Sequence, residues 1–152
     1  MNIKNCFKKG LLRKCDFSSE IAAKEIENAK RHLKNASHCF EDEIFDLAIV
    51  SVYTSMFHAA RAILFRDGIK ERSHICVMIY IKEEYSHLKE YATILDTYRR
   101  SRHTMLYGID VDMIADDASQ GISLAEEFII AIEKELNVGS QDKGEDNSKI
   151  TT

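Results

Sequence analysis

The chain has 152 residues, of which 45% are hydrophobic and 30% are charged, the ordinary balance of a globular protein with one core. Its formal net charge of −4 excludes a global positive field that would attract nucleic acid, so any contact with RNA must come from a local basic patch. The sequence contains no proline, the strongest helix breaker, and long helices are therefore the default expectation.

Residues 1–17 form a basic lead-in that lacks the continuous apolar core and the small-residue cleavage site of a secretion signal. No stretch of the chain approaches the roughly 20 apolar residues that a membrane span needs. The four cysteines show neither CxxC spacing nor a paired Cys/His signature, which argues against a structural zinc site and favours small buried side chains in a reducing compartment. These features predict a cytoplasmic protein without membrane contacts.

Two long helices are predicted in the first half of the folded part. Ser18 is a plausible N-cap for a helix over residues 19–40, where apolar residues recur at helical spacing. A second helix is predicted over residues 43–66, closed by the pair Asp67-Gly68. It is apolar on several sides, which predicts a central, buried helix. We also expect a partner subunit to cover part of this surface, at Val52, Met56 and Ile63.

The second half adds three more helices. Ser73 can cap a shorter helix over "SHICVMIYIKEEY", a fourth covers about residues 87–107 and ends at Gly108, and a fifth follows a cap at Asp110 or Asp112. Residues 138–152 are polar and aperiodic, which predicts a disordered tail. No strand alternation is visible. Residues 18–137 are therefore predicted to form an all-α up-and-down bundle of four to five helices.

Residues 48–81, "AIVSVYTSMFHAARAILFRDGIKERSHICVMIYI", resemble the core of the HEPN superfamily. The resemblance rests on the segment from Phe57 to Ala62, on the pair Ser73-His74, and on Arg102 followed five residues later by Tyr107 and the acidic stretch "GIDVD". It covers about residues 18–137, which is essentially the whole folded part. Within the superfamily, the chain resembles a small prokaryotic subfamily that has the Phe-His-Ala-Ala-Arg-Ala and Arg-x4-Tyr elements.

This resemblance implies a HEPN-like bundle that usually forms a homodimer, with the arginine-containing element lining a cleft at the dimer interface. Many members of the superfamily are metal-independent ribonucleases of toxin–antitoxin or defence systems and use an Arg-x(4–6)-His motif. Others pair with a minimal nucleotidyltransferase or have a proposed role in binding RNA or a nucleotide. No cofactor is implied.

The stretch "YRRSRHTMLYG", residues 98–108, is the densest basic patch of the chain. A ribonuclease needs a group that titrates near neutral pH, usually histidine, together with fixed positive donors for the phosphate. With four to six residues in between, the positions before His103 are Tyr98, Thr97 and Asp96, and the positions after Arg102 are Tyr107, Gly108 and Ile109. The ribonuclease motif is therefore absent from this stretch.

Two functional hypotheses remain for the basic patch, beside a structural one. In the first, the protein is a binding or regulatory module in which Arg99, Arg100, Arg102 and Tyr107 hold RNA or a nucleotide. In the second, it is a divergent endoribonuclease toxin in which His103 and Arg102 are catalytic. The structural alternative is that arginines near a helix C-terminus only complement the helix dipole. The missing motif spacing favours the binding module.

Other polar side chains are interpreted as structural. His58 is expected to be satisfied inside the bundle and Arg61 to pair with a carboxylate, with a supporting role near the cleft as the alternative. His74 is expected to cap or pack near the start of the third helix. The carboxylates of "FEDEIFD", residues 40–46, precede a helix N-terminus, where they are favourable without any metal ion.

Overall fold

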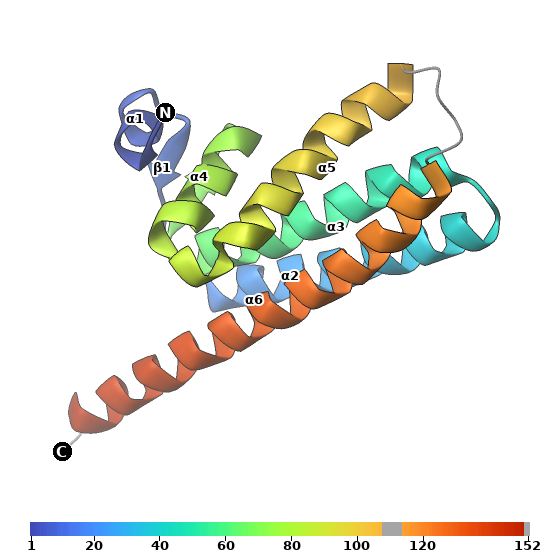
Figure 1. Ribbon diagram of the computed structural model, residues 1–152. Coiled ribbons are helices and arrows are strands. Elements are labelled where there is room, and N and C mark those ends of the chain that lie inside the picture. Colours follow the sequence, from blue (N-terminus) through green and yellow to red (C-terminus); the bar gives the residue numbers. More distant parts are fainter. Residues whose placement is uncertain (108–113, 151–152) are drawn as a thin grey trace.

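The computed structural model describes the backbone of residues 1–107 and 114–150, and the side chains of residues 1–102 and 115–137. The described elements, in chain order, are α1 (Ile3–Lys8), β1 (Leu12–Lys14), α2 (Ser19–Glu41), α3 (Phe45–Arg66), β2 (Ile69–Glu71), α4 (His74–Glu84), the 3-10 helix η1 (Ser86–Leu88), α5 (Lys89–Tyr107) and α6 (Ile114–Ile150). The predicted all-α bundle is confirmed (Figure 1).

The helix α3 lies at the centre of the bundle, in contact with α2, α4, α5 and α6 (Figure 1). Its wholly buried side chains include Tyr53, Met56, Ile63 and Leu64. Ser55, also wholly buried, donates its hydroxyl hydrogen to the carbonyl oxygen of Ala29 at 2.7 Å and so joins α3 to α2. The prediction that the second long helix is central and buried is therefore confirmed.

One inference about α3 is wrong. Val52, Met56 and Ile63 are each 0% exposed within the single chain, so they leave no apolar surface for a partner subunit to cover. The helices on several sides of α3 already bury it.

The expectation that no stretch is long and apolar enough to cross a bilayer is also wrong. By length and composition alone, α3 could span one. However, 67% of its most apolar window is buried inside the bundle, as in the core helix of a soluble protein.

The predicted helix boundaries follow from local capping. The hydroxyl oxygen of Ser18 accepts a hydrogen bond from the backbone N–H of Ile21 at 3.0 Å, and Ser73 caps α4 in the same way. After α3, Gly68 has a φ of +74°, and a Cβ atom there would lie 2.8 Å from the carbonyl oxygen of Cys15. Glycine is required at this position both for the turn and for the close approach of the backbone.

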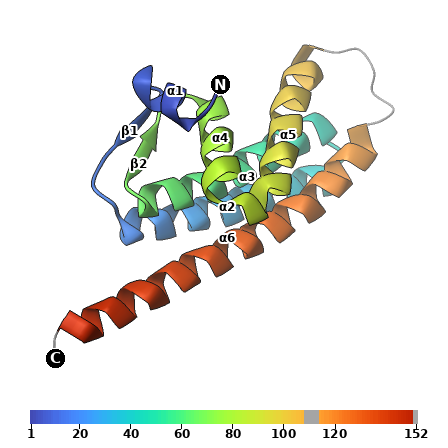
Figure 2. The ribbon, with the colours of Figure 1, turned by 60° about the vertical axis from the view of Figure 1, so that its left-hand side comes forward.

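The basic lead-in is more structured than the sequence indicates. It contains α1 and β1, and β1 pairs antiparallel with β2 so that Leu12 faces Glu71. These strands have three residues each, which is too short for an alternating pattern to be visible. Leu12 is 1% exposed, so the lead-in contributes to the core. Together with α4, it forms one end of the molecule (Figure 2).

The prediction that the cysteines are isolated, reduced side chains is wrong for two of the four. Cys6 of α1 and Cys76 of α4 are both wholly buried and form a disulfide with a Cα–Cα distance of 5.9 Å. Cys15 and Cys39 are free. The disulfide fixes the N-terminal segment to the start of α4, close to the site described below.

The helix α6 runs along α2 and α3 and then projects beyond the bundle (Figure 1). Its backbone continues through residues 138–150, the range for which the sequence predicts a disordered tail. The order of this range in solution stays a prediction. The expected caps at Asp110 and Asp112 lie outside the described residues.

Candidate phosphate-binding site

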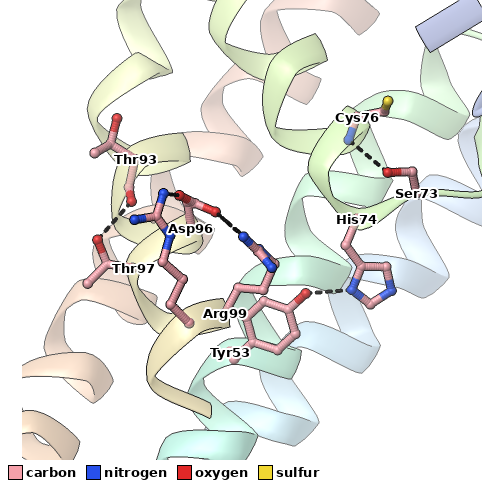
Figure 3. A network of polar contacts seen from close by, with 9 residues as sticks. Tyr53, Ser73, His74, Cys76, Thr93, Asp96, Thr97 and Arg99 are labelled. Atoms are coloured by element: carbon pink, nitrogen blue, oxygen red, sulfur yellow. Dashed lines mark hydrogen bonds and ion pairs between the residues drawn. The ribbon is translucent and has the colours of Figure 1, made fainter. Parts of the chain in front are cut away.

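Two of the three clustered arginines are held by a carboxylate on the same helix. Asp96 forms ion pairs with Arg99 at 3.0 Å and with Arg100 at 2.5 Å, at the spacings i,i+3 and i,i+4. Arg100 lies on the exposed side of α5, whereas the Arg99 side chain extends toward Tyr53 of α3 (Figure 3). Among the described side chains, Asp96 offsets one of the three guanidinium charges.

Arg102 is one turn further along and packs on an aromatic ring. Its Cζ atom lies 4.7 Å from the centre of the Tyr53 ring, in the geometry of a cation–π contact. Among the side chains that the structure describes, no carboxylate lies within ion-pair distance of Arg102. Arg102 is half-buried, and its guanidinium is held in place by the contact with the Tyr53 ring rather than by an opposite charge within the described part.

The hydroxyl group of Tyr53 forms a hydrogen bond with Nδ1 of His74 at 2.6 Å (Figure 3). His74 is the first residue of α4, and its ring stacks on Phe57 with a centroid distance of 4.0 Å. Tyr53 is 1% exposed, whereas His74 is exposed. The expected packing of His74 is confirmed, but the cap is made by Ser73 alone. The imidazole thus has one buried edge and one edge toward solvent.

The surroundings keep both of these groups uncharged at neutral pH. Burial raises the pKa of the Tyr53 hydroxyl, although the charges of Arg102 and Arg99 oppose this effect. Burial lowers the pKa of His74, and the positive charges of Arg102, Arg61 and Arg99 lower it further against the opposing charge of Glu71. The imidazole is therefore neutral at pH 7, because its usual pKa is already below that value.

A second polar chain crosses from α2 to α3 and β2 beside this cluster. His58 Nδ1 lies 2.6 Å from Glu25 Oε2, and Arg61 lies 3.6 Å from the same oxygen. The Nε atom of Arg61 is also 2.9 Å from Glu71, as an ion pair without a well-aligned hydrogen bond. The predicted satisfaction of His58 and the predicted pairing of Arg61 with a carboxylate are both confirmed.

The structure therefore brings Arg99 and Arg102 together with Tyr53 and His74 and leaves Arg100 on the outer side. The side chains of His103 and Tyr107 lie outside the described residues, so their proposed roles stay predictions. Tyr53 and His74 belong to this cluster, but the sequence did not predict either of them as a binding or catalytic residue. They are 21 positions apart on different helices, and only the Ser-His pair at a helix start gave any signal.

Other features of the described part do not coincide with this cluster. A cavity of about 250 Å³ lies between α2 and α6 and is lined by residues that include Ala22, Arg66 and Leu136, but by none of the cluster. We give more weight to the cluster than to this cavity, because Arg66 is already bonded to Tyr85 and to a backbone carbonyl. No group of three or more His, Cys, Asp or Glu side chains in the described part could hold a metal ion.

Comparisons with known proteins give one family model and one relative of this chain. The model of the HEPN domain matches residues 5–136, which include most of α1, the whole cluster and most of the described part of α6. The chain is also 26% identical over 131 residues to the protein named "Putative toxin MJ0142" of Methanocaldococcus jannaschii, which corresponds to 83% of this chain and 89% of that protein.

Proposed function

Because this chain belongs to the HEPN domain family, we propose that it is a toxin-like module that binds the phosphate groups of RNA or of a nucleotide at the end of α5. The observation that carries this proposal is the placement of Arg102. Its guanidinium lies on Tyr53 beside Arg99 and, within the described part, has no carboxylate partner. Arginine forks of this kind recognise phosphate oxygens with paired hydrogen bonds.

The toxin-like assignment is supported by the similarity to a protein that is named a toxin. We further propose that the protein acts in the cytoplasm as a homodimer, in a toxin–antitoxin-like system with a minimal nucleotidyltransferase as its partner. Since α3 is already buried within one chain, the homodimer rests on the family resemblance and needs another surface. The homodimer is tested by light scattering at micromolar concentration. A mass of 17.4 kDa, that of one chain, would contradict it.

The experiment that tests phosphate binding compares two triple variants of equal charge. Arg99, Arg100 and Arg102 are replaced by glutamine in the first, and Lys24, Arg31 and Lys34, which are exposed on α2, in the second. Binding of a single-stranded RNA octamer is measured over a range of salt concentrations.

The α5 variant should bind more weakly and with a smaller dependence on salt, by about 0.7 in log–log slope for each phosphate group that the variant no longer neutralises. The α2 variant should behave like the wild type. Equal effects of the two variants would show that only net charge matters and would contradict a localised site.

A second candidate function is a metal-independent endoribonuclease. The observation that favours it is a neutral imidazole, that of His74, beside Arg99 and Arg102, which gives the site a titratable group despite the missing motif spacing. The test is incubation of the purified protein with RNA in EDTA. Cleavage that is lost in His74→Asn would make the His74 imidazole catalytic, whereas cleavage that is lost in His103→Ala would make His103 catalytic, with Arg102 as its cationic neighbour. Either result would overturn the binding-only proposal.

A further inference from the structure

We propose that His74 is a direct ligand of the bound phosphate group and that Tyr53 positions its imidazole ring. This inference rests on the proposed function and deepens it, because it adds residues of α3 and α4 to a site that the sequence places on α5 alone. The ligand is a phosphate group, carried either by an RNA strand or by a free nucleotide.

The hydrogen bond to Tyr53 determines which edge of the imidazole is available. A phenol hydroxyl is a good donor, and the Tyr53 oxygen lies 2.6 Å from Nδ1 of His74 in a nearly water-free position. When Tyr53 donates to Nδ1, the neutral imidazole carries its hydrogen on Nε2. The structure therefore favours a tautomer whose N–H is on the outer edge, where it can donate to an anion.

The ring is also held in orientation. Its face stacks on Phe57 with an interplanar angle of 28°, and Phe57 is 8% exposed and fixed in the core. With one face against Phe57 and one nitrogen on Tyr53, the ring cannot rotate without breaking both interactions. His74 is thus an exposed side chain in a fixed orientation, which is the property expected of a ligand-binding group.

The electrostatic surroundings favour an anion at this edge. The charged and titratable groups that face His74 come from three elements: Tyr53 and Arg61 of α3, Arg99 and Arg102 of α5, and Glu71 of β2. Of these described groups, Arg61 and Arg99 are paired with carboxylates, and Arg102 is the cation without such a pair. His74 is moreover the first residue of α4, where the helix dipole is positive and phosphate oxygens are stabilised.

Binding of a phosphate should reverse the electrostatic balance at His74. In the free protein burial and the surrounding cations lower the pKa of His74, so its imidazole is neutral at pH 7. An anion at Nε2 stabilises the imidazolium, in which Nδ1 donates its hydrogen to the Tyr53 oxygen, and raises the pKa of His74. The complex then takes up a proton as the pH falls, and affinity should increase with decreasing pH, up to about tenfold per pH unit.

The experiment measures the affinity of an oligouridine octamer with hydroxyl ends between about pH 5.5 and 7.5, a window around the usual pKa of histidine. Internal phosphodiesters and uridine keep their charge in this window, so the protein is the source of any pH dependence. Three variants are compared with the wild type: His74→Asn, Arg102→Gln, and the control His38→Asn, which changes an exposed histidine on α2. Asparagine can still accept the hydrogen of Tyr53 but does not reach the position of Nε2.

The wild type and His38→Asn should bind more tightly at low pH. Arg102→Gln should bind more weakly at every pH and still show a slope, although a shallower one, because the loss of this cation raises the pKa of His74 in the free protein. His74→Asn should lose the slope altogether and about tenfold in affinity at the lowest pH. If His74→Asn keeps the wild-type slope, His74 is not a ligand, although the α5 site survives. If the wild type binds no octamer at any pH, both proposals fail.

A second readout separates a ligand from a residue that only supports folding. The imidazole resonances of His74 should titrate at a higher pH in the presence of the octamer, and those of His38 should not. Tyr53→Phe should reduce this shift, because the ring loses its orienting bond. Repeating the titration with the 5′-phosphorylated octamer and with AMP identifies the source of the phosphate, since a site for a free nucleotide would bind AMP at least as tightly as the strand.

Discussion

Glu25 shows how single charged residues hold the helices around the candidate site. This side chain of α2 is only 10% exposed and accepts contacts from His58 and Arg61 of α3. Burial alone would raise the pKa of Glu25, but the hydrogen bond from His58 and the charge of Arg61 outweigh it and lower the pKa below its usual value. The carboxylate is therefore charged in the folded protein and stabilises it.

Replacing Glu25 with glutamine should lower the free energy of unfolding at pH 7 by about 1–2 kcal/mol, since the partly buried Arg61 loses one of its two carboxylate partners. The contribution of Glu25 is complete above the ordinary carboxyl pKa and is lost as the pH falls through the lowered one. The difference between the variant and the wild type should accordingly shrink below about pH 4.5. Urea denaturation at several pH values checks this, with the exposed neighbour Glu27→Gln as the control.

At the scale of elements, the contact between α5 and α6 depends on one glycine. A Cβ atom at Gly121 would lie 2.9 Å from a ring carbon of Tyr98, whose hydroxyl group donates to the carbonyl oxygen of Asp117 at 3.0 Å. Glycine at this position allows the Tyr98 ring to lie directly on the backbone of α6.

We expect Gly121→Ala to destabilise the protein by about 1 kcal/mol, although alanine is the better helix former. The cost of displacing the buried Tyr98 ring, about 1–3 kcal/mol, exceeds the gain in helix propensity. Thermal denaturation should show a lower midpoint for Gly121→Ala but not for the matched variant Ser123→Ala on the exposed face of α6. A higher midpoint for Gly121→Ala would mean that the ring moves without cost.

The ends of α3, α4 and η1 are joined by a carboxylate that accepts two phenol hydrogens. Asp67 receives hydrogen bonds from Tyr80 and Tyr85, and Tyr85 also accepts one from Arg66. Burial, and then the bond to Asp67, raise the pKa of both tyrosines. The folded state therefore holds these protons more tightly than the unfolded chain does.

Stability should consequently fall as the pH rises above about 10, where the tyrosines of the unfolded chain ionise and those of the folded protein do not. Tyr85→Phe should cost about 1–2 kcal/mol at pH 8 and should show a smaller alkaline loss. Tyr91→Phe is the control, because Tyr91 packs its ring on Phe128 and its hydroxyl makes no hydrogen bond with the described residues. Equal alkaline losses in both variants would contradict the assignment.

At the scale of the whole molecule, local signals predicted the helices and missed the contacts between them. Ser18 and Ser73 mark the starts of helices through hydrogen bonds to nearby backbone, and Gly68 marks the end of α3 through its positive φ. These roles depend on residues adjacent in the sequence, so the sequence predicts them. The pair Tyr53 and His74 requires α3 and α4 to be side by side, and no periodicity contains that information. The same holds for the burial of Val52, which depends on helices that pack on it from several sides.

The Cys6–Cys76 disulfide was hidden for the same reason, since 70 positions separate the two residues. Closing a loop of this length should stabilise the oxidised protein by about 4 kcal/mol relative to the reduced one. We expect reduction to lower the thermal midpoint of the wild type but not that of the double variant Cys6→Ala, Cys76→Ala. The variant Cys15→Ser, at an exposed free cysteine, should respond like the wild type.

The same covalent link divides the chain mechanically. When the two ends of the oxidised protein are pulled apart, the load passes from Cys6 directly to Cys76, and the loop that holds α2 and α3 carries none of it. At about 3.4 Å per extended residue, the loop withholds roughly 240 Å of contour length until the disulfide is reduced. Since Tyr53 lies inside this loop and His74 two residues before its end, tension on the termini would remove α6 and α5 from the site while α2 and α3 remain within an untensioned ring.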